Sequence, residues 1–449
     1  MRVSVYIPNP YSLIPESLIK ERNKLMRKVS VGFLGCGNIG CGVWKLLNEF
    51  KADMLHRADV EFDVKRILVR DVKKKRDQVV PQELLTTDPK QVTDDPGIEM
   101  VLEFMGGETP ATQYMLRALE MGKTVVTANK MALALNWHTL QAAAEKHGSG
   151  LYYEAAVCGA IPIIRTTLDS LQSNRIEEMM GIVNGTTNYI LTRMSQEGSD
   201  YAEVLSDAQR LGLAEPDPTS DVEGFDAAYK LSILSSLAFH ARVPFDVIYR
   251  QGITQVSAAD IAFGKELGYT LKLLAIAKRK GNVIDARVHP TFIPDAHPLA
   301  AVNGSFNAIF LHGHACDDMM LFGRGAGSAP TASAVVADML YAVSRETPRH
   351  PTFRNTNELA EGLTVTDDWH CSFYVRLTAS DRPGVLARIT ACLGDEGISI
   401  RNLMQRDAVD GHAQIVLITH DAGECAIRKA LAAIASDDVK VESMIRVER

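Results

Sequence analysis

The chain has 449 residues, of which 46% are hydrophobic and 23% are charged, a composition typical of a globular protein with two or three domains. The formal net charge of −7 is spread along the chain, which argues against nucleic acid or an anionic membrane as a partner. The seven cysteines are scattered and no apolar stretch is long enough to span a bilayer, so we expect a cytoplasmic protein.

The first predicted domain covers residues 28–154 and follows an N-terminal extension, residues 1–27, that lacks the pattern of a secretory signal. A β-rich strand over residues 28–34 leads into a GxGxxG turn and then an amphipathic helix. Glycines in this context allow a tight turn, close approach of a pyrophosphate and packing of helix on strand, and the helix N-terminus offers amides to the phosphates. The alternative is a tight turn without a ligand. We predict dinucleotide binding by Gly35, Gly37, Asn38, Ile39 and Gly40.

The second predicted strand, residues 64–69, is followed by Arg70, Asp71 and a run of basic residues. A strand-end arginine suits the 2′-phosphate of NADP, whereas an acid suits the ribose hydroxyls of NAD. The sequence therefore favours NADP. Asp71 keeps NAD as an alternative, and the basic run could also be a solvated surface.

Further strands at 98–104, 124–128 and 151–154 alternate with helices at 109–121 and 137–147. This alternation predicts an α/β, doubly wound parallel sheet of the Rossmann type. Ligands bind beyond the carboxyl ends of such strands. Thr127 and Lys130 stand at one of these ends, where we expect the nicotinamide.

The middle of the chain, residues 155–329, mixes helices and strands and predicts an α+β domain, after which a helix at 330–344 returns to the nucleotide domain. Within it, an acidic loop leads into an apolar helix on which Asp226 and Lys230, four residues apart, share one face. A lysine held by carboxylates at the mouth of a buried helix suits proton transfer. The alternative interpretation is a structural ion pair.

Residues 28–343 resemble the homoserine dehydrogenase family, because six segments occur in that family's order: the glycine turn, residues 128–130, 153–164, the NGTTNYIL stretch around 184–191, the acidic segment 215–230, and 323–338. The resemblance implies oxidation of L-homoserine to L-aspartate 4-semialdehyde with NAD(P)+. It also implies the reverse reaction, in threonine, methionine and isoleucine biosynthesis.

The resemblance also assigns roles to single residues. It implies that Lys130 and Lys230 are active-site lysines, with Lys230 the proton donor and acceptor and Asp226 its support. Two lysines at one site lower each other's pKa while Asp226 raises both, and the sequence leaves open which effect dominates. The implied substrate residues are Glu215, which binds the amino group, and Gly185, Thr186 and Asp221; Gly325 is added to the cofactor site.

The family carries a monovalent cation, usually sodium, on a loop that matches Glu154 and the backbone at Val157, Gly159 and Ile161. Backbone carbonyls with one carboxylate suit a hard cation, although Ala160 stands where glycine is usual. The alternative is that Glu154 caps the end of its strand. The strands of the middle domain form the dimer surface in the family, so we expect a homo-oligomer, either a dimer or a tetramer.

After a linker, residues 345–368, the segment 369–449 predicts the order βαββαβ of a ferredoxin-like domain. It resembles an ACT domain, whose first loop corresponds here to Asp381, Arg382, Pro383 and Gly384. Such domains pair edge to edge and bind amino acids near this loop, which implies feedback inhibition by L-threonine. The alternative is a module used only for dimerisation.

Two other functions compete with this interpretation. A non-catalytic amino-acid-sensing protein could have the same fold, but it would be expected to have replaced Lys130, Lys230 or Glu215, and all three are present. The other is an enzyme that acts on a different amino acid, and only the NGTTNYIL and acidic segments argue against it.

Overall fold

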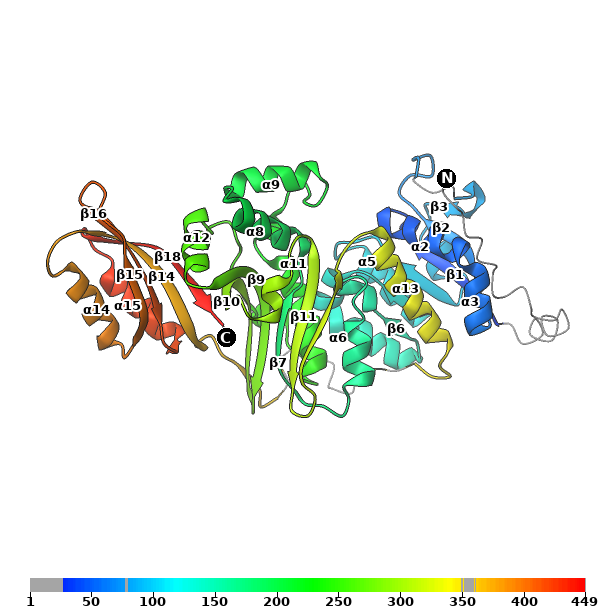
Figure 1. The fold of residues 1–449 in the computed structure, drawn as a ribbon. Helices are drawn as coiled ribbons and strands as arrows, with labels where there is room; N and C mark the ends of the chain where they lie inside the picture. Colours follow the sequence, from blue (N-terminus) through cyan, green and yellow to red (C-terminus); the bar gives the residue numbers. More distant parts are fainter. Residues whose placement is uncertain (1–26, 77–79, 349, 351–358, 360, 449) are drawn as a thin grey trace, which may run out of the picture.

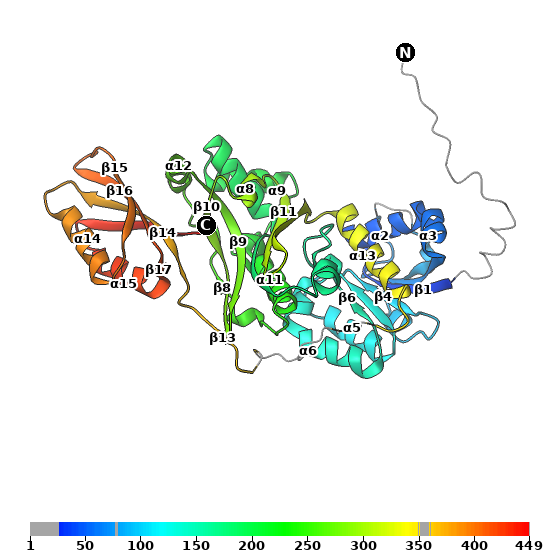
Figure 2. The same ribbon diagram turned by 60° about the horizontal axis from the view of Figure 1, so that its bottom comes forward.

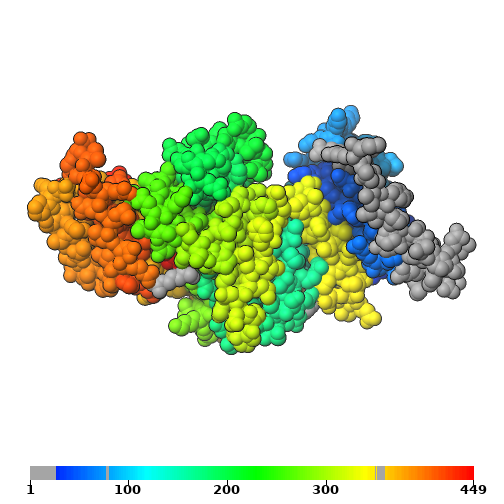
Figure 3. Space-filling view, viewed as in Figure 1, coloured from blue at the N-terminus to red at the C-terminus, as the bar shows by residue number. Residues whose placement is uncertain are grey.

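The computed structural model describes residues 27–76, 80–348, 350, 359 and 361–448. The expected N-terminal extension therefore lies outside the described residues, except for Arg27, as do positions 349, 351–358 and 360 of the expected linker. The three folded parts lie in a row along an elongated molecule (Figure 1, Figure 3). Within the described ranges, no helix combines the length and the apolar character needed to cross a bilayer.

The first part is a parallel sheet whose described strands have the order β3-β2-β1-β4-β5-β6. The order reverses between β1 and β4, which is the point in such sheets where ligands bind. This confirms the predicted doubly wound fold. The strands are β1 (Arg27–Leu34), β2 (Val60–Leu68), β3 (Leu85–Thr86), β4 (Met100–Glu103), β5 (Thr124–Thr127) and β6 (Leu151–Tyr152).

Helices cover both faces of this sheet (Figure 2). One face carries α2 (Asn38–Glu49), α3 (Lys51–Ala58) and, packed against α2, the returning helix α13 (Ser328–Val343). The other face carries α4 (Lys90–Thr93), α5 (Ala111–Glu120) and α6 (Lys130–His147). Helix α6 begins seven residues earlier than predicted, because the Asn129 side chain caps it by accepting the N–H of Ala132 at 3.0 Å.

The second part is built on the strands β7 (Ile176–Ile182), β9 (Tyr269–Lys280), β10 (Val283–Pro294), β11 (Phe306–Gly313) and β12 (Asp317–Arg324). Neither β7 nor β12 was predicted, since acids at 177, 178, 317 and 318 interrupt their apolar patterns. Helices pack on the sheet or near it: α7 (Ile163–Arg165), α8 (Gly185–Glu197), α9 (Tyr201–Arg210), α10 (Thr219–Val222), α11 (Phe225–Ala238) and α12 (Ala258–Glu266).

The third part has the predicted ferredoxin-like order of β14 (His370–Ser380), α14 (Val385–Asp395), β15 (Ile400–Gln405), β16 (His412–Thr419), α15 (Glu424–Ile434) and β18 (Val439–Val447). Its sheet is continuous with that of the second part, because β18 pairs in parallel with β10. The short strand β13 (Thr364–Val365), inside the expected linker, also pairs with β10. The two parts are therefore joined by a shared sheet as well as by the linker.

Buried ion pairs accompany this junction. Glu448 contacts Arg287 of β10, Glu424 contacts Arg446 of β18, and Asp260 of α12 accepts the Nε–H of Arg376 of β14 at 2.7 Å. These charged groups are buried. A pair of this kind is costly to break, because removal of one partner leaves the other charge buried and unpaired.

Candidate active site

Two lysines from different parts of the fold meet on one carboxylate. Asp226 lies in the first turn of α11, Lys230 follows one turn later, and Lys130 is the first residue of α6. The Lys230 Nζ is 2.7 Å from Asp226 Oδ2 and also donates to the Val183 carbonyl at 2.6 Å. The Lys130 Nζ is 2.9 Å from Asp226 Oδ1. The Lys230 and Asp226 side chains are buried, whereas that of Lys130 is 40% exposed.

The charges in this cluster determine its protonation. Burial opposes ionisation of Asp226, but the ammonium groups of Lys130 and Lys230 outweigh burial and hold the pKa of Asp226 well below its usual range. Asp226 in turn raises the pKa of Lys130 above its ordinary value, against the effect of burial. The sequence left open whether the carboxylate or the second lysine dominates. For Lys130 the carboxylate dominates.

Asn184 connects this cluster to the expected substrate residues. Its side-chain N–H groups donate to Asp221 Oδ1 at 2.7 Å and Asp226 Oδ2 at 2.8 Å, while its oxygen accepts the Thr187 N–H at 2.8 Å and thereby caps α8. Burial and the charge of Asp226 raise the pKa of Asp221. No role was predicted for Asn184, although an asparagine directly before a helix is a recognisable cap.

The other expected substrate residues surround the same place. Gly185 begins α8, and Thr186 donates through its hydroxyl to the Leu213 carbonyl at 2.7 Å. Glu215 is exposed, but it lies near enough for its charge to contribute to the raised pKa of Lys130. The structure therefore brings the expected lysines, Asp226, Asp221, Thr186 and Glu215 into one neighbourhood.

The glycine turn between β1 and α2 has the geometry of a dinucleotide site. Gly35 has φ +101°, and a Cβ on Gly40 would lie 2.8 Å from the Gly35 carbonyl oxygen, so both positions require glycine. A Cβ on Gly37 would meet no atom of the described chain within 4 Å, so this glycine is not required by packing. Asn38 and Ile39 form the first turn of α2, whose amides point toward this turn.

Comparisons with known proteins agree with this arrangement. A family model described as homoserine dehydrogenase matches residues 162–340, its NAD-binding domain matches 35–154, and an ACT domain matches 373–438. A homoserine dehydrogenase of Bacillus subtilis is 41% identical over 94% of this chain and 99% of its own length. The chain belongs to the homoserine dehydrogenase family.

Other members of the family give the same result. The homoserine dehydrogenase of Mycobacterium tuberculosis is 42% identical, with 94% of this chain and 98% of the relative covered. The crystal structure of a homoserine dehydrogenase from Thiobacillus denitrificans superimposes with a TM-score of 0.88 at 41% identity, covering 94% of this chain and 99% of that one. The family and the three-part fold predicted from the sequence are thereby confirmed.

The carboxyl ends of β4 and β5 carry a buried polar group of the nucleotide domain. Glu103 is completely buried and accepts the Thr127 hydroxyl at 2.6 Å and the Met105 N–H at 2.7 Å. Burial raises the pKa of Glu103. The Thr127 hydroxyl in turn accepts the Asn129 N–H at 2.9 Å, which fixes the start of α6 beside Lys130. Glu103 was not predicted, although an acid at the end of an apolar strand is a visible signal.

Two expected cofactor residues belong to segments other than the glycine turn itself. Arg70 is exposed just beyond the end of β2. Gly325, after β12, is packed tightly: a Cβ there would lie 2.0 Å from the Asn307 amide nitrogen, and a Cβ on Gly159 would lie 2.8 Å from the Gly325 carbonyl. Gly325 is therefore required by packing, whatever contact it makes with a cofactor.

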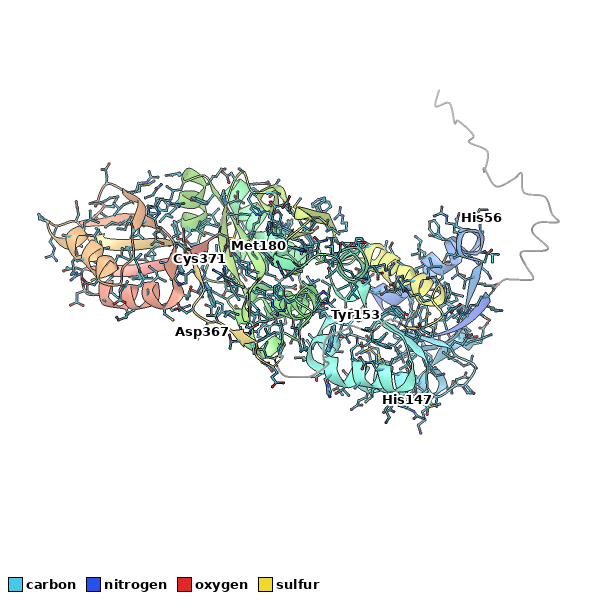
Figure 4. The ribbon with its side chains drawn as sticks, turned by 90° about the horizontal axis from the view of Figure 1, so that it is seen from below. His56, His147, Tyr153, Met180, Asp367 and Cys371 are labelled. Atoms are coloured by element: carbon cyan, nitrogen blue, oxygen red, sulfur yellow. The ribbon has the colours of Figure 1, made fainter. Side chains whose placement is uncertain are left out.

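The expected cation loop follows Tyr153, near the middle of the molecule (Figure 4). Glu154 begins a 3₁₀ turn, and its two carboxylate oxygens each accept a backbone N–H at 2.8 Å, from Ile164 and Arg165 at α7. The Ile161 carbonyl accepts the Ile163 N–H at 2.8 Å. The carboxylate thus caps the start of α7, whereas the alternative interpretation had it cap the end of its own strand. Among the described residues, no three His, Cys, Asp or Glu side chains group as metal ligands, which does not bear on a carbonyl site.

The expected effector loop is remote from the lysines. Asp381, Arg382, Pro383 and Gly384 are exposed in the ACT domain, at the opposite end of the molecule from the nucleotide domain (Figure 1). Gly384 has φ +92° and precedes α14, for which no side-chain cap is found among the described residues. Arg382 pairs with Asp438, and Gln405 donates to Asp381 at 3.3 Å.

Proposed function

We propose that this protein oxidises L-homoserine to L-aspartate 4-semialdehyde with NAD(P)+ and catalyses the reverse reduction. The observation that carries the proposal is the pair of lysines on Asp226, one from the nucleotide domain and one from the substrate domain. A group transferred between a nucleotide and a substrate must pass between these domains. Both lysines lie where the two domains meet.

In the oxidation, the O–H proton of the alcohol passes to the Nζ of an uncharged Lys230, while a bound nicotinamide would accept the hydride from the alcohol carbon. In the reduction, the Lys230 ammonium gives its proton to the carbonyl oxygen as hydride arrives. The Asp226 carboxylate accepts a hydrogen bond from the Lys230 Nζ at 2.7 Å and so holds this group in place. This arrangement supports Lys230 as the proton donor in the reduction, which is the biosynthetic direction.

Lys130 has a second role in this scheme. Because Asp226 raises its pKa, Lys130 stays cationic at neutral pH. A fixed ammonium beside the substrate oxygen stabilises the negative charge that develops on that oxygen during hydride transfer. Glu215 and Asp221 supply acids for the substrate ammonium, and Gly185 and Thr186 border the same space.

We propose NADP as the preferred cofactor, with NAD as the alternative. The glycine turn fits a pyrophosphate, since its glycines keep side chains away from the helix amides. Bound there, the cofactor supplies the hydride acceptor. Arg70 is exposed at the end of β2, where a guanidinium can pair with a 2′-phosphate.

Three further features complete the proposal. L-threonine inhibits the enzyme through the loop at 381–384, where the start of α14, which no side chain of the described residues caps, suits an amino-acid carboxylate. A monovalent cation binds backbone carbonyls of the loop from Glu154 to Ile161, with Val157 and Gly159 as ligands. The chain forms a homo-oligomer, supported by the terminal strand β12, on which Met320 and Phe322 are 39% and 54% exposed.

The test is a spectrophotometric assay of nicotinamide reduction with homoserine and either NAD+ or NADP+, with L-serine, one methylene shorter, as the matched control. Homoserine-dependent reduction is expected. If homoserine or threonine binds in calorimetry while no reduction occurs, the protein is the non-catalytic amino-acid sensor instead. Sodium or potassium dependence of the same rate tests the cation, and light scattering tests the oligomer.

A further inference from the structure

Arg242, just beyond the end of α11, links the two helices that carry the lysines. It is 2% exposed. Its Nη2 donates to the Ala134 carbonyl of α6 at 2.6 Å. Its Nη1 donates to the hydroxyls of Ser232 and Ser236 of α11 at 2.9 and 3.2 Å, and to the Val243 carbonyl at 2.8 Å. A single guanidinium therefore bridges the nucleotide and substrate domains.

The bond to α6 falls where that helix is interrupted. Asn136 has φ −121° and ψ 27°, values outside the helical range, so α6 is kinked there. Ala134 lies in the last turn before the kink, one turn after Lys130. Carbonyls at such a helix end lack partners within the helix and carry partial negative charge. Arg242 supplies both a hydrogen bond and a positive charge at that end.

Burial of the Arg242 guanidinium costs folding free energy, so packing alone does not explain why an arginine stands at this position. The hydrogen-bond partners of the guanidinium are neutral oxygens, and its buried Nε has no partner among the described residues. Burial lowers the pKa of Arg242 to about 10, only partly opposed by Asp246, so the group is charged at neutral pH. A buried charge bonded to neutral groups costs stability that a hydrophobic residue would not.

We propose that Arg242 is a positioning residue, which fixes the separation of Lys130 and Lys230 by tying α6 to α11 about one turn behind them. This inference rests on the proposed roles of the two lysines. The helices then have two cross-links: Lys130 to Asp226 at the site, and Ala134 to Arg242 behind it. Loss of the second lets the segment of α6 before the kink move away from Asp226.

The test compares Arg242→Lys with Arg279→Lys. Arg279 of β9 donates to the Phe239 carbonyl at the end of α11 at 2.5 Å, a similar bond that does not reach α6. A lysine at 242 keeps the charge but cannot bond both helices with a planar fork. We expect kcat to fall about 10- to 100-fold in Arg242→Lys, with the KM for cofactor nearly unchanged, because small misplacements of reacting groups have effects of this size. Arg279→Lys should leave kcat within about twofold, since it leaves the lysine pair in place.

The decisive readout is the titration of Lys130, followed by NMR of isotopically methylated lysines, which does not require turnover. Asp226 raises the pKa of Lys130, so separation from Asp226 must lower it. The proposal would be overturned if Arg242→Lys only lowered the melting temperature. In that case the pKa of Lys130 and the kcat at saturating cofactor would both be unchanged. If Arg242→Lys does not fold, the double variant Ser232→Ala/Ser236→Ala weakens the α11 anchor and should move both readouts in the same direction. If wild type does not turn over homoserine, the proposed function fails, yet the titration still tests the positioning.

Discussion

Asp226 has one carboxylate oxygen for each lysine, Oδ1 for Lys130 and Oδ2 for Lys230. A third donor, the Asn184 amide, shares Oδ2. The carboxylate is thus fully engaged and cannot rotate without breaking several bonds at once. The Lys230 ammonium is held by two acceptors, which aims it at a fixed position rather than leaving it to solvent.

We predict that Lys230→Ala lowers kcat by about 10²- to 10⁴-fold, because it removes the positioned proton donor and acceptor. Steady-state kinetics and a circular dichroism melt on the same preparation check this. Lys272→Met is the matched control, since Lys272 is also a buried lysine bonded to a carbonyl, that of Val302 at 2.6 Å, but it is bonded to none of the carboxylates of the site. Near-normal turnover of Lys230→Ala would make the lysine part of a structural ion pair.

We also predict a cofactor effect at Arg70. Arg70→Ala should weaken NADP+ binding about tenfold or more and NAD+ binding much less, because only NADP+ offers a phosphate to the guanidinium. Fluorescence titration with each cofactor measures the two affinities. Lys65→Ala, an exposed cation of β2 paired with Asp63 at 2.6 Å, serves as the control for general charge loss. Equal losses for both cofactors would mean that Arg70 lies away from the ribose.

At the scale of elements, α13 is joined to the start of the substrate domain by a buried carboxyl. Asp338 of α13 accepts the Glu154 N–H at 2.8 Å and an N–H of Arg165 at 2.7 Å. Burial and the charge of Glu154 raise the pKa of Asp338 to about 7, against the effect of Arg165. The folded protein therefore binds a proton here that the unfolded chain, with a pKa of about 4, releases.

The sign of the resulting pH dependence follows. Between about pH 4 and 7 the folded state holds more protons at Asp338 than the unfolded state, so its contribution to stability falls as pH rises through this window. We predict that Asp338→Asn removes this decline. The melting temperature of the variant minus that of the wild type should therefore rise from pH 5 to pH 7 and be constant above pH 7. Melts from pH 5 to 8 measure the difference. Parallel curves for the two proteins would show that Asp338 is ionised throughout.

Sequence reasoning succeeded where one element carries its own signal. The glycine turn, α15 and the order of the ferredoxin-like strands depend on local patterns, and the structure confirms them. It failed for β7 and β12. The acids of β12 are tolerated because exposed side chains alternate along that strand, and the two adjacent acids of β7 are only half-buried. It also began α6 too late, because the Asn129 cap was not considered.

Within the site, the family pattern indicated the lysines and acids, and the spacing of four residues indicated the contact of Lys230 with Asp226. Partners from distant segments could not be predicted. The pairing of Lys130 with Asp226 joins elements from two domains. The role of Glu154 as a helix cap depends on the approach of α7. Arg242 lies outside every quoted motif, and only the folded arrangement of α6 and α11 reveals its bridge. Such contacts are long-range, and no local spacing specifies them.

At the scale of the whole molecule, the shared sheet makes the ACT domain a structural support of the substrate domain. Deleting the ACT domain would uncover the edge of β10, leave Asp260 without Arg376, and remove Glu448 from Arg287, which would keep only its contact with Asp285 at 3.2 Å. We therefore expect deletion after about residue 361 to destabilise the substrate domain, and point substitutions are the better test of regulation. A sheet that runs from the ACT domain into β10, and a helix α12 that packs on α8, give physical continuity toward the substrate residues.

We predict that threonine inhibits the enzyme and that Asp381→Asn raises the inhibitory concentration about tenfold, or ~1.4 kcal/mol, by removing a negative charge that attracts the threonine ammonium. Asp395→Asn, an exposed acid at the other end of α14, is the control. Inhibition curves for the three proteins, with calorimetry, provide the measurement. A wild-type enzyme indifferent to millimolar threonine and without a heat of binding would make the domain a dimerisation module only.

The return of α13 to the first domain also governs how the protein is made. The cluster of Phe33, Val43 and Leu47 is completed by Val335 and Met339, so the part of this face that α2 and α3 do not cover stays exposed until α13 has left the ribosome. Residues 155–327 are synthesised in between, which takes roughly ten to thirty seconds at ordinary translation rates. The N-terminal domain therefore cannot complete its fold before the domain that follows it in the chain has been synthesised. For that interval the nascent chain exposes the apolar side chains that α13 later covers, where a chaperone that recognises such surfaces can bind.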